Sequence, residues 1–573
     1  MRTIFDIASD LPRTLQLAVL TLGVALPACS DSTTGPSMPD TVSPTPAPDP
    51  APPSESSMDP LPDPATPPLG SGQIDVPTEV MGTETPVSAK YWPLGVPQGV
   101  PMYGDGPIRA LITFPLRNQA DLEARIASMY NPASPKFRKY LTVAEYMASY
   151  APAQSNIDAT TAWLVSKGFK IERVATNRLM LFYSGTVDQW NAAFGVTLYN
   201  MKRSPTTVRD WSYAPITEVN VPQPLIGQIK RLLLPDVDLP TDKLSADSAP
   251  VSTTPPSGVG TKLVPSQIAS AYGINELYAK GYKGAGMTMG IIGATTIRAS
   301  DAQSMWQTFG ITRKSPTIVE PMEPMYTRGL ETALDIQLAG AIAPEAELIF
   351  YGGPNTSDTS LLFTFNEAVG ANQAQVLSDS FAHAEASSPA PVARAYNESA
   401  MIAAALGITV VSAAGDSNQV DVPSDSPYVT AVGGTNVDLN PDGTWMHEQS
   451  WELGGCGLSR VFAQPSWQAG LYPKANGRRT VSDVGVVVDP SWVKFLGNWT
   501  YADGTSGSSP VFGAMLLLID QARKAQGKPQ VGYINSLIYQ HAATRAAFRD
   551  IVDQGSGGCA TAVGYDLATG VGS

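Results

Sequence analysis

The chain has 573 residues, of which 15% are charged, and its formal net charge is −14 at pH 7. This length leaves room for two or more domains with sizeable cores. The acidic balance excludes the positively charged surface needed to bind nucleic acid or an anionic membrane, so we expect neither as a partner of the folded chain.

Histidine and cysteine are both scarce, which narrows the kinds of catalytic and metal site available. The three histidines are His383, His447 and His541. Most serine and cysteine hydrolases use histidine as their base, and neither HExxH nor paired CxxC motifs occur to suggest zinc. Cys456 and Cys559 form either a disulfide, which an exported protein permits, or two buried thiols, and the sequence leaves both open.

Residues 1–29 have the features of an export signal. The apolar run over 15–26 is too short to span a bilayer but fits the hydrophobic region of a signal peptide. It ends in Leu26-Pro27-Ala28-Cys29, which resembles the lipobox of bacterial lipoproteins. We therefore predict a lipid anchor on Cys29, with ordinary secretion as the alternative. Residues 30–89, rich in Pro and Ser, are predicted to be a disordered tether.

Residues 90–240 are predicted to form a compact α+β domain. Its elements follow the order strand 108–116, helix 118–130, loop 131–150, helix 155–169, strands 170–185 and helix 187–195. The sequence of this domain contains no nucleophile cluster, metal set or phosphate loop. The Pro- and Ser-rich stretch over 241–263 is either an inert linker or the region of activation cleavage, and we favour cleavage because a protease cuts exposed, flexible chain.

Residues 264–573 alternate apolar strands with helices. Strands are predicted at 287–293, 346–353, 374–380, 408–416 and 428–435, and helices at 328–343 and 396–407. Nearly continuous apolar strands separated by helices indicate a parallel, doubly wound sheet, whose functional sites lie at the carboxyl ends of the strands.

Gly504-Thr505-Ser506 begins the last long apolar helix. The glycine turn places Ser506 in the first turn of that helix, and Pro510 is expected to be tolerated because the first turn has N–H groups to spare. Backbone N–H groups and the helix dipole converge beside the Ser506 hydroxyl, where they can hold an oxyanion. An N-capped buried helix without catalytic function is the alternative.

Three acids accompany this serine. Glu331 and Asp335 are four residues apart on a predicted helix, so they share one face. They are either a solvated acidic face or a carboxyl pair that shares a proton, one member acting as a base and the other orienting it. Asp416 follows an apolar strand and a glycine, so it is either a loop cap or a residue at the strand end where α/β sheets place their sites.

Together these motifs resemble the sedolisin, or serine-carboxyl peptidase, family. The family's ExxxD helix matches Glu331 to Asp335, its GTSxxxP matches Gly504 to Pro510, and its Gly-Asp-Ser contains Asp416. Further landmarks agree in order: "SPKFRKYLT", "WLVSKGF" and "VDQWNAAFGV" in the first domain, and the segments 422–435, 457–468 and 481–490 in the second. The resemblance implies a subtilisin-like doubly wound catalytic domain over 264–573, preceded by a ferredoxin-like activation prodomain.

The same resemblance implies a function. Ser506 would be the nucleophile, Glu331 the general base and later acid, Asp335 its orienter, and Asp416 part of the oxyanion hole. We expect an exported zymogen of an acid-acting endopeptidase that forms an acyl-enzyme and acts as a monomer on protein and peptide substrates. A tripeptidyl-peptidase of the family and a non-catalytic surface lipoprotein are the alternatives. A subtilisin-like Asp-His-Ser triad is disfavoured because no histidine lies in the required sequence context.

The C-terminal segment resembles the family's loop for one structural Ca²⁺. The ligands implied are the side chains of Asp550 and Asp566 and the carbonyls of Ile551, Ala562 and Gly564, with Asp553 as an alternative acid in the same loop. Hard oxygen ligands suit calcium, whereas a Gly-rich acidic surface loop is the alternative. Two positions depart from the family pattern: Ala382 replaces a glycine after an aromatic residue, and Cys456 interrupts a run of glycines.

Overall fold

The computed structural model describes residues 97–101, 108–202, 211–215, 221–233, 263–322, 329–386, 388–489, 491–540, 546–555 and 557–573. The predicted export signal, the Pro-rich tether and residues 241–262 of the predicted linker lie outside these ranges. Within them, no helix combines the length and the hydropathy needed to cross a membrane.

The N-terminal domain contains two antiparallel sheets. Its elements are β1 (Pro97–Pro101), β2 (Ile108–Thr113), α1 (Gln119–Met129), α2 (Val143–Ser149), α3 (Gln154–Ser166), β3 (Lys170–Val174), β4 (Met180–Gly185), α4 (Val187–Phe194), β5 (Leu198–Lys202), β6 (Trp211–Pro215) and β7 (Arg231–Leu233). The larger sheet has the order β3-β4-β2-β7, so its fourth, first, third and second strands lie side by side, with helices in the first and last connections. This topology is the expected ferredoxin-like α+β arrangement.

The segment 131–150, predicted to be a loop, contains helix α2. A capping box begins it: the Glu145 N–H donates to Thr142 Oγ1 (3.2 Å), and the Thr142 N–H donates to Glu145 Oε2 (2.8 Å). These reciprocal bonds satisfy two N–H groups that a helix start otherwise leaves unpaired. The prediction of a loop was therefore wrong. The Thr-x-x-Glu pattern in the sequence is the signature of a capping box and indicates a helix start here.

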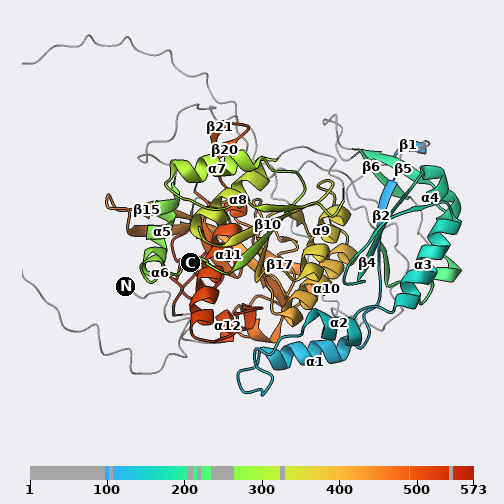
Figure 1. Ribbon diagram of the computed structural model, residues 1–573, viewed down its shortest axis with the longest axis horizontal. Coiled ribbons are helices and arrows are strands. Elements are labelled where there is room, and N and C mark those ends of the chain that lie inside the picture. Colours follow the sequence, from blue (N-terminus) through green and yellow to red (C-terminus); the bar gives the residue numbers. More distant parts are fainter. Residues whose placement is uncertain are drawn as a thin grey trace, which may run out of the picture. The chain divides into compact units, whose positions relative to one another are not determined.

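The C-terminal domain is the predicted α/β domain (Figure 1). Its elements are α5 (Pro265–Ala271), α6 (Ile274–Ala279), β8 (Thr288–Gly293), α7 (Ala299–Thr308), β9 (Thr317–Val319), α8 (Leu330–Ile342), β10 (Glu347–Gly352), α9 (Asp358–Ala371), β11 (Val376–Asp379), β12 (His383–Ala384), α10 (Ala390–Leu406), β13 (Thr409–Ala413), β14 (Asp421–Val422), β15 (Thr430–Leu439), β16 (Trp445–Ser450), β17 (Gly457–Ala463), β18 (Arg478–Val481), β19 (Val484–Val487), β20 (Ser491–Phe495), β21 (Asn498–Ala502), α11 (Thr505–Ala525) and α12 (Asn535–Gln540).

The main sheet has the order β16-β15-β13-β11-β8-β10-β9, and β19 also pairs with β15. Every pairing in it is parallel except β15 with β16. Helices α8 and α11 contribute to the apolar core of one face, and α9 and α10 to that of the other. The domain is therefore doubly wound, and the carboxyl ends of β8, β11 and β13 meet at one edge of the sheet.

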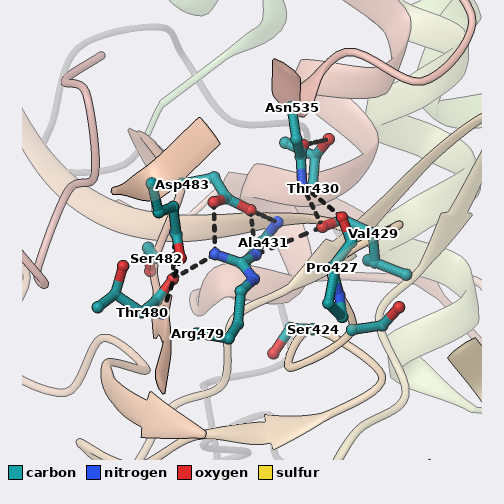
Figure 2. A network of polar contacts seen from close by, with 12 residues as sticks. Ser424, Pro427, Val429, Thr430, Ala431, Arg479, Thr480, Ser482, Asp483 and Asn535 are labelled. Carbon is teal, nitrogen blue, oxygen red and sulfur yellow. Dashed lines mark hydrogen bonds and ion pairs between the residues drawn. The ribbon is translucent and has the colours of Figure 1, made fainter. Parts of the chain in front are cut away.

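A buried polar network anchors β15 to β18 and β19 (Figure 2). The Arg479 guanidinium, which is fully buried, pairs with Asp483 through Nη1 (2.7 Å) and Nη2 (2.5 Å). Asp483 also accepts the Ala431 N–H (2.8 Å) and the Tyr539 hydroxyl (2.6 Å). Because each buried charge has several partners, this network fixes the register of the segments 422–435 and 478–487 beside the site edge.

Ion pairs join the two domains, and those made by Glu398 are buried. Glu398 of α10 accepts from Lys230 Nζ (2.5 Å) and Arg231 Nη1 (2.8 Å) of the N-terminal domain, and all three side chains are at most 9% exposed. Glu367 of α9 is paired with Arg173 (2.8 Å). Burial raises the pKa of Glu398, but the charges of Arg231 and Lys230 outweigh burial and hold that pKa below its ordinary value. The interface is therefore stabilised above the pKa of a free glutamate and weakened as pH falls through the lowered value.

Glu398→Gln is expected to weaken this interface at neutral pH by about 3 to 5 kcal/mol, because it leaves two buried cations without their anion. Thermal unfolding of the full-length chain at pH 7 and at successively lower pH measures the effect, which should persist until the pH falls through the lowered pKa of Glu398. Glu172→Gln is the control, because Glu172 pairs with Lys170, which is 75% exposed. Equal destabilisation by both variants at pH 7 would contradict the assignment.

Candidate active site

Helix α8 carries the two predicted acids on a buried face. Glu331 is 2% exposed and Asp335 is fully buried, so the alternative of a solvated acidic face is wrong. The Ser380 hydroxyl lies 3.0 Å from Asp335 Oδ1 and donates to it. Burial, then the charge of Glu331, raise the pKa of Asp335 well above its usual range; the Ser380 hydrogen bond opposes them, and the charge of Asp379 adds a smaller increase. This acid pair therefore holds a proton at a pH where free carboxyls are ionised.

Helix α11 begins at Thr505, so Ser506 is its second residue, buried at 2% exposure. The preceding Gly504 has φ 117°, and a Cβ at this position would lie 2.7 Å from Asp416 Oδ2. Only glycine therefore allows the turn to adopt this conformation against the Asp416 carboxyl group.

Asp416 lies beyond the carboxyl end of β13 and is bonded to the residue before the serine. Its Oδ1 accepts the Thr505 N–H (3.0 Å) and the Thr505 hydroxyl (2.6 Å), and that hydroxyl in turn accepts the Gly415 N–H (3.1 Å). The positive end of the α11 dipole points at this carboxyl group. Asp416 is therefore held at the helix N-terminus, adjacent to Ser506.

Pro510 does not lie in the first turn, as the sequence suggested: it is the sixth residue of α11 and lies inside the helix. A proline has no N–H to donate to the carbonyl four residues earlier, which here belongs to Ser506. The Ser380 hydroxyl is 3.2 Å from that carbonyl oxygen and bonds to it. The proline therefore leaves the carbonyl of Ser506 available to the side chain that directly follows β11.

The four predicted catalytic residues are thus brought together from three elements. Asp335 and Ser506 both contact Ser380, Glu331 lies one turn from Asp335, and Asp416 is bonded to the neighbour of Ser506. Leu334 and Leu338 of α8 face α11 at Gly507, where a Cβ would lie 3.4 Å from Leu338 and 3.9 Å from Leu334. The two helices therefore pack closely beside the serine.

Sequence reasoning missed two residues of the site, Ser380 and Asp379. Asp379 ends β11 fully buried, and its Oδ1 accepts the Phe381 N–H (3.1 Å). Burial raises the pKa of Asp379 to about 8, against smaller opposing effects of that N–H group and of His383. An aspartate at the end of an apolar strand was the available signal.

The two described histidines both have carboxylate partners. His383 pairs through Nδ1 with Asp358 of α9. His447 lies between Asp438 (3.4 Å) and Asp553 (2.8 Å). His541 lies outside the described residues.

The comparisons with known proteins agree with this geometry. One family model, "Pro-kumamolisin, activation domain", matches residues 100–232, and another, "Subtilase family", matches residues 322–565. Kumamolisin from Bacillus sp. (strain MN-32) is 31% identical over 529 residues, which cover 84% of this chain and 92% of kumamolisin. The chain belongs to the sedolisin family. It is a serine-type peptidase of the serine-carboxyl kind, with an activation domain ahead of the peptidase domain.

Other members of the sedolisin family match over similar lengths. Tripeptidyl-peptidase 1 of Homo sapiens is 26% identical, over 81% of this chain and 89% of that protein. Sedolisin of Pseudomonas sp. (strain 101) is 24% identical, over 81% of this chain and 85% of that protein. A solved structure of Pseudomonas sedolisin, complexed with two molecules of pseudo-iodotyrostatin, covers 55% of this chain and 96% of its own, with 23% identity and a TM-score of 0.49.

The segment of this sedolisin-family chain predicted to bind calcium forms one compact loop. Asp550 Oδ2 accepts the Gly564 N–H (2.9 Å), and Asp566 Oδ2 accepts the Ala562 N–H (3.1 Å). Asp566 is 2% exposed, and burial raises its pKa against several opposing backbone hydrogen bonds. No cluster of three or more His, Cys, Asp or Glu suited to a metal occurs among the described residues. The predicted set is smaller than such a cluster, because it has two carboxylates and takes its other three ligands from the carbonyls of Ile551, Ala562 and Gly564. Carboxylate and carbonyl oxygens are both suitable ligands for calcium.

Cys456 and Cys559 form a disulfide, which decides between the two states that the sequence left open. The bond joins the loop after β16 to the C-terminal loop. Next to Cys456, the Gly455 N–H donates to the Gly415 carbonyl (2.6 Å), and a Cβ at position 455 would lie 1.9 Å from the Ala414 carbonyl oxygen. Glycine at 455 therefore lets the disulfide-bonded loop pack directly on the backbone that precedes Asp416.

Proposed function

We propose that this peptidase is an acid-acting endopeptidase, exported as a zymogen, that uses Ser506, Glu331 and Asp335 as its catalytic triad. The observation that carries the proposal is the buried acid pair of α8, which is bound through Ser380 to Ser506 in the first turn of α11. Two buried acids beside a serine supply a base without any histidine. The disulfide supports export, because such bonds persist in oxidising compartments.

In the proposed mechanism, the Ser506 hydroxyl attacks the carbonyl carbon of the scissile peptide and passes its proton to the Glu331 carboxylate. Asp335 holds Glu331 in position. Protonated Asp416 donates a hydrogen bond to the oxyanion that forms. Glu331 then gives the proton to the leaving amine, and an acyl-enzyme remains on Ser506. Water, deprotonated by Glu331, hydrolyses this ester and regenerates the serine.

Acidification of the purified full-length chain with a denatured protein substrate tests the proposal. Self-cleavage between the activation and peptidase domains and digestion of the substrate are both expected at acid pH and not at neutral pH. Digestion at neutral pH at the acid rate would contradict an acid mechanism. Mass spectrometry of the products separates endopeptidase action from the second candidate, which the relative named tripeptidyl-peptidase 1 suggests, because the second would release only tripeptides from N-termini.

Asp416→Asn is expected to keep activity at neutral pH that the parent loses. A carboxyl group donates to an oxyanion only while protonated, whereas the asparagine amide donates at every pH. In acid the variant should be slower than the parent, and Asp416→Ala should lose about 10²- to 10³-fold in kcat. The measurement is kcat/KM against pH, and an Asp416→Asn profile parallel to that of the parent would overturn the role of Asp416.

Unfolding must be separated from ionisation in that experiment. The folded pKa of Asp379, about 8, lies above the ordinary value, so the stability linked to this group is fully present below about pH 4 and is lost as pH rises toward 8. Melting temperatures of parent and variant at each pH therefore accompany the rates. Only a loss of rate in fully folded protein counts as evidence about Asp416.

We also propose one structural Ca²⁺ held by the side chains of Asp550 and Asp566 and by the carbonyls of Ile551, Ala562 and Gly564. A chelator is expected to lower the melting temperature of the parent, because an ion that binds only the folded state stabilises it by mass action. Asp566→Asn should remove this sensitivity. Asp553→Asn, which changes an acid bonded to His447 in the same segment, should keep it. A parent unaffected by the chelator would show that the loop is stable without the ion.

A further inference from the structure

Two serines at the carboxyl end of β11, Ser378 within the strand and Ser380 directly after it, meet helix α11. The two residues are two apart, the spacing of side chains on one face of a strand, and both hydroxyls contact this helix. The Ser378 hydroxyl bonds to the Ser509 hydroxyl (2.9 Å). One step further along, the Ser380 hydroxyl reaches both the Ser506 carbonyl (3.2 Å) and Asp335 Oδ1 (3.0 Å). Ser380 therefore contacts both the serine-bearing helix and the acid-bearing helix.

A hydroxyl has only one hydrogen, so Ser380 cannot donate to both oxygens at once. Its second acceptor is present because Pro510 denies the Ser506 carbonyl its helical N–H donor. When Asp335 is ionised, the hydroxyl donates to the carboxylate. When Asp335 holds a proton, the carboxyl O–H donates to Ser380 Oγ, and the Ser380 hydrogen is released to the Ser506 carbonyl. The direction of the chain of hydrogen bonds thus follows the protonation of Asp335.

We propose that Ser380 is a positioning residue that couples the protonation of Asp335 to the placement of Ser506, through a hydroxyl shared between the carboxyl group and the carbonyl that Pro510 leaves open. This inference rests on the proposed function, because it gives the acid pair the task of serving Ser506. It adds a residue that acts through Asp335 and touches no reacting atom itself.

The turn after β11 fixes this hydroxyl. The Asp379 carboxyl group accepts the Phe381 N–H across Ser380, which holds the residue between them in one conformation. The titratable groups that act on Asp335 are Glu331 of its own helix and Asp379 of β11, and His383 acts on Asp379 in turn. From α11, Ser506 presents a neutral carbonyl. The Ser380 hydrogen bond opposes the two acidic neighbours of Asp335 by stabilising its ionised form.

Removing the Ser380 hydroxyl should therefore change the pH dependence of kcat/KM, which a simple loss of packing would not change. In Ser380→Ala, the pH at which kcat/KM rises on its acid side should move upward by about half to one unit, because the Asp335 carboxylate loses a donor. We expect kcat to fall about 10- to 100-fold with KM changed less than about twofold, since the loss concerns orientation rather than substrate binding. Ser380→Thr, which keeps the hydroxyl, should restore the parent profile.

Ser378→Ala is the matched control, because it removes a buried hydroxyl between the same strand and the same helix without touching Asp335. It should lower the melting temperature and leave the shape of the pH profile unchanged. If Ser380→Ala does not fold, Ser380→Cys provides the same test, because the thiol is of similar size and a weak donor. A Ser380→Ala or Ser380→Cys profile that superimposes on that of the parent would overturn the inference.

Ser506→Ala separates this inference from the proposed function. If Ser506→Ala is inactive while the Ser380 variants keep the parent profile, the triad stands and the role of Ser380 falls. If Ser506→Ala digests substrate as the parent does, the proposed function falls, and this inference with it.

Discussion

Ser506→Ala is expected to abolish both self-cleavage and substrate digestion in acid, with kcat lowered by a factor on the order of 10⁶. The reason is chemical: alanine has no oxygen that can form the acyl-enzyme, and the acid pair cannot replace it. The side chain is small and 2% exposed, so the substitution should leave the fold and the melting temperature close to those of the parent. The measurement is acidification of each full-length protein, followed by gel analysis and by an assay on a peptide substrate.

Ser508→Ala is the control for that loss. The Ser508 hydroxyl lies in the same helical turn, within hydrogen-bond distance of the carbonyls of Val486 (2.9 Å) and Val487 (3.0 Å), and donates its one hydrogen between them. Its removal should lower stability by about 1 to 3 kcal/mol and preserve activity at temperatures where the protein is folded. Activity in Ser506→Ala, or equal inactivation of both variants in folded protein, would refute the assignment of the nucleophile.

Glu331→Gln is expected to lower kcat about 10⁴-fold or more at every pH. Glutamine has the same size and shape but cannot accept the proton that the Ser506 hydroxyl must lose. The variant also removes the charge that raises the pKa of Asp335, so the proton shared by the acid pair should be held less tightly. Rates in single turnover against pH measure both effects.

Glu347→Gln is the comparison for Glu331→Gln, because it makes the same chemical change in an exposed pair with Lys314 (2.6 Å). Parent activity is expected in this variant. If Glu331→Gln retained more than about a hundredth of the parent rate, loss of the base would be too small an effect, and Glu331 would be only a neighbour of the reaction.

Much of the fold could be predicted because apolar strands and helical spacing are local properties of the sequence. The predicted strands at 287–293 and 374–380 correspond to β8 and β11, and the helix predicted at 328–343 corresponds to α8. Their parallel arrangement followed from the helices between them. The acids and the serine could be singled out by residue type and spacing, and the structure places them around one helix N-terminus.

The contacts of Ser380 could not be predicted, because they depend on which strand neighbours which helix. Nothing local in "LSDSF" shows that one serine faces Asp335 and another faces Ser509. Pro510 was predicted to lie in the first turn because the sequence does not show at which residue α11 begins. The residue at which the helix begins also decides whether a proline leaves a carbonyl without its N–H donor. The burial of Glu331 and Asp335 likewise comes from packing against α11, which a helix pattern alone does not reveal.

The disulfide between Cys456 and Cys559, which are 103 positions apart in the sequence, closes a covalent ring of the chain. Ser506 lies within that ring. A peptidase stored with its own copies is exposed to cuts in its surface loops. A single cut between 456 and 559 opens the ring into a linear chain but releases no fragment, because both pieces stay joined through sulfur. A nicked molecule would therefore run as one species on a non-reducing gel and as two after reduction. Before reduction, Ser506 and the two acids Glu331 and Asp335 remain parts of one covalently linked molecule. Damage that would divide an unlinked chain leaves this one intact as a single molecule.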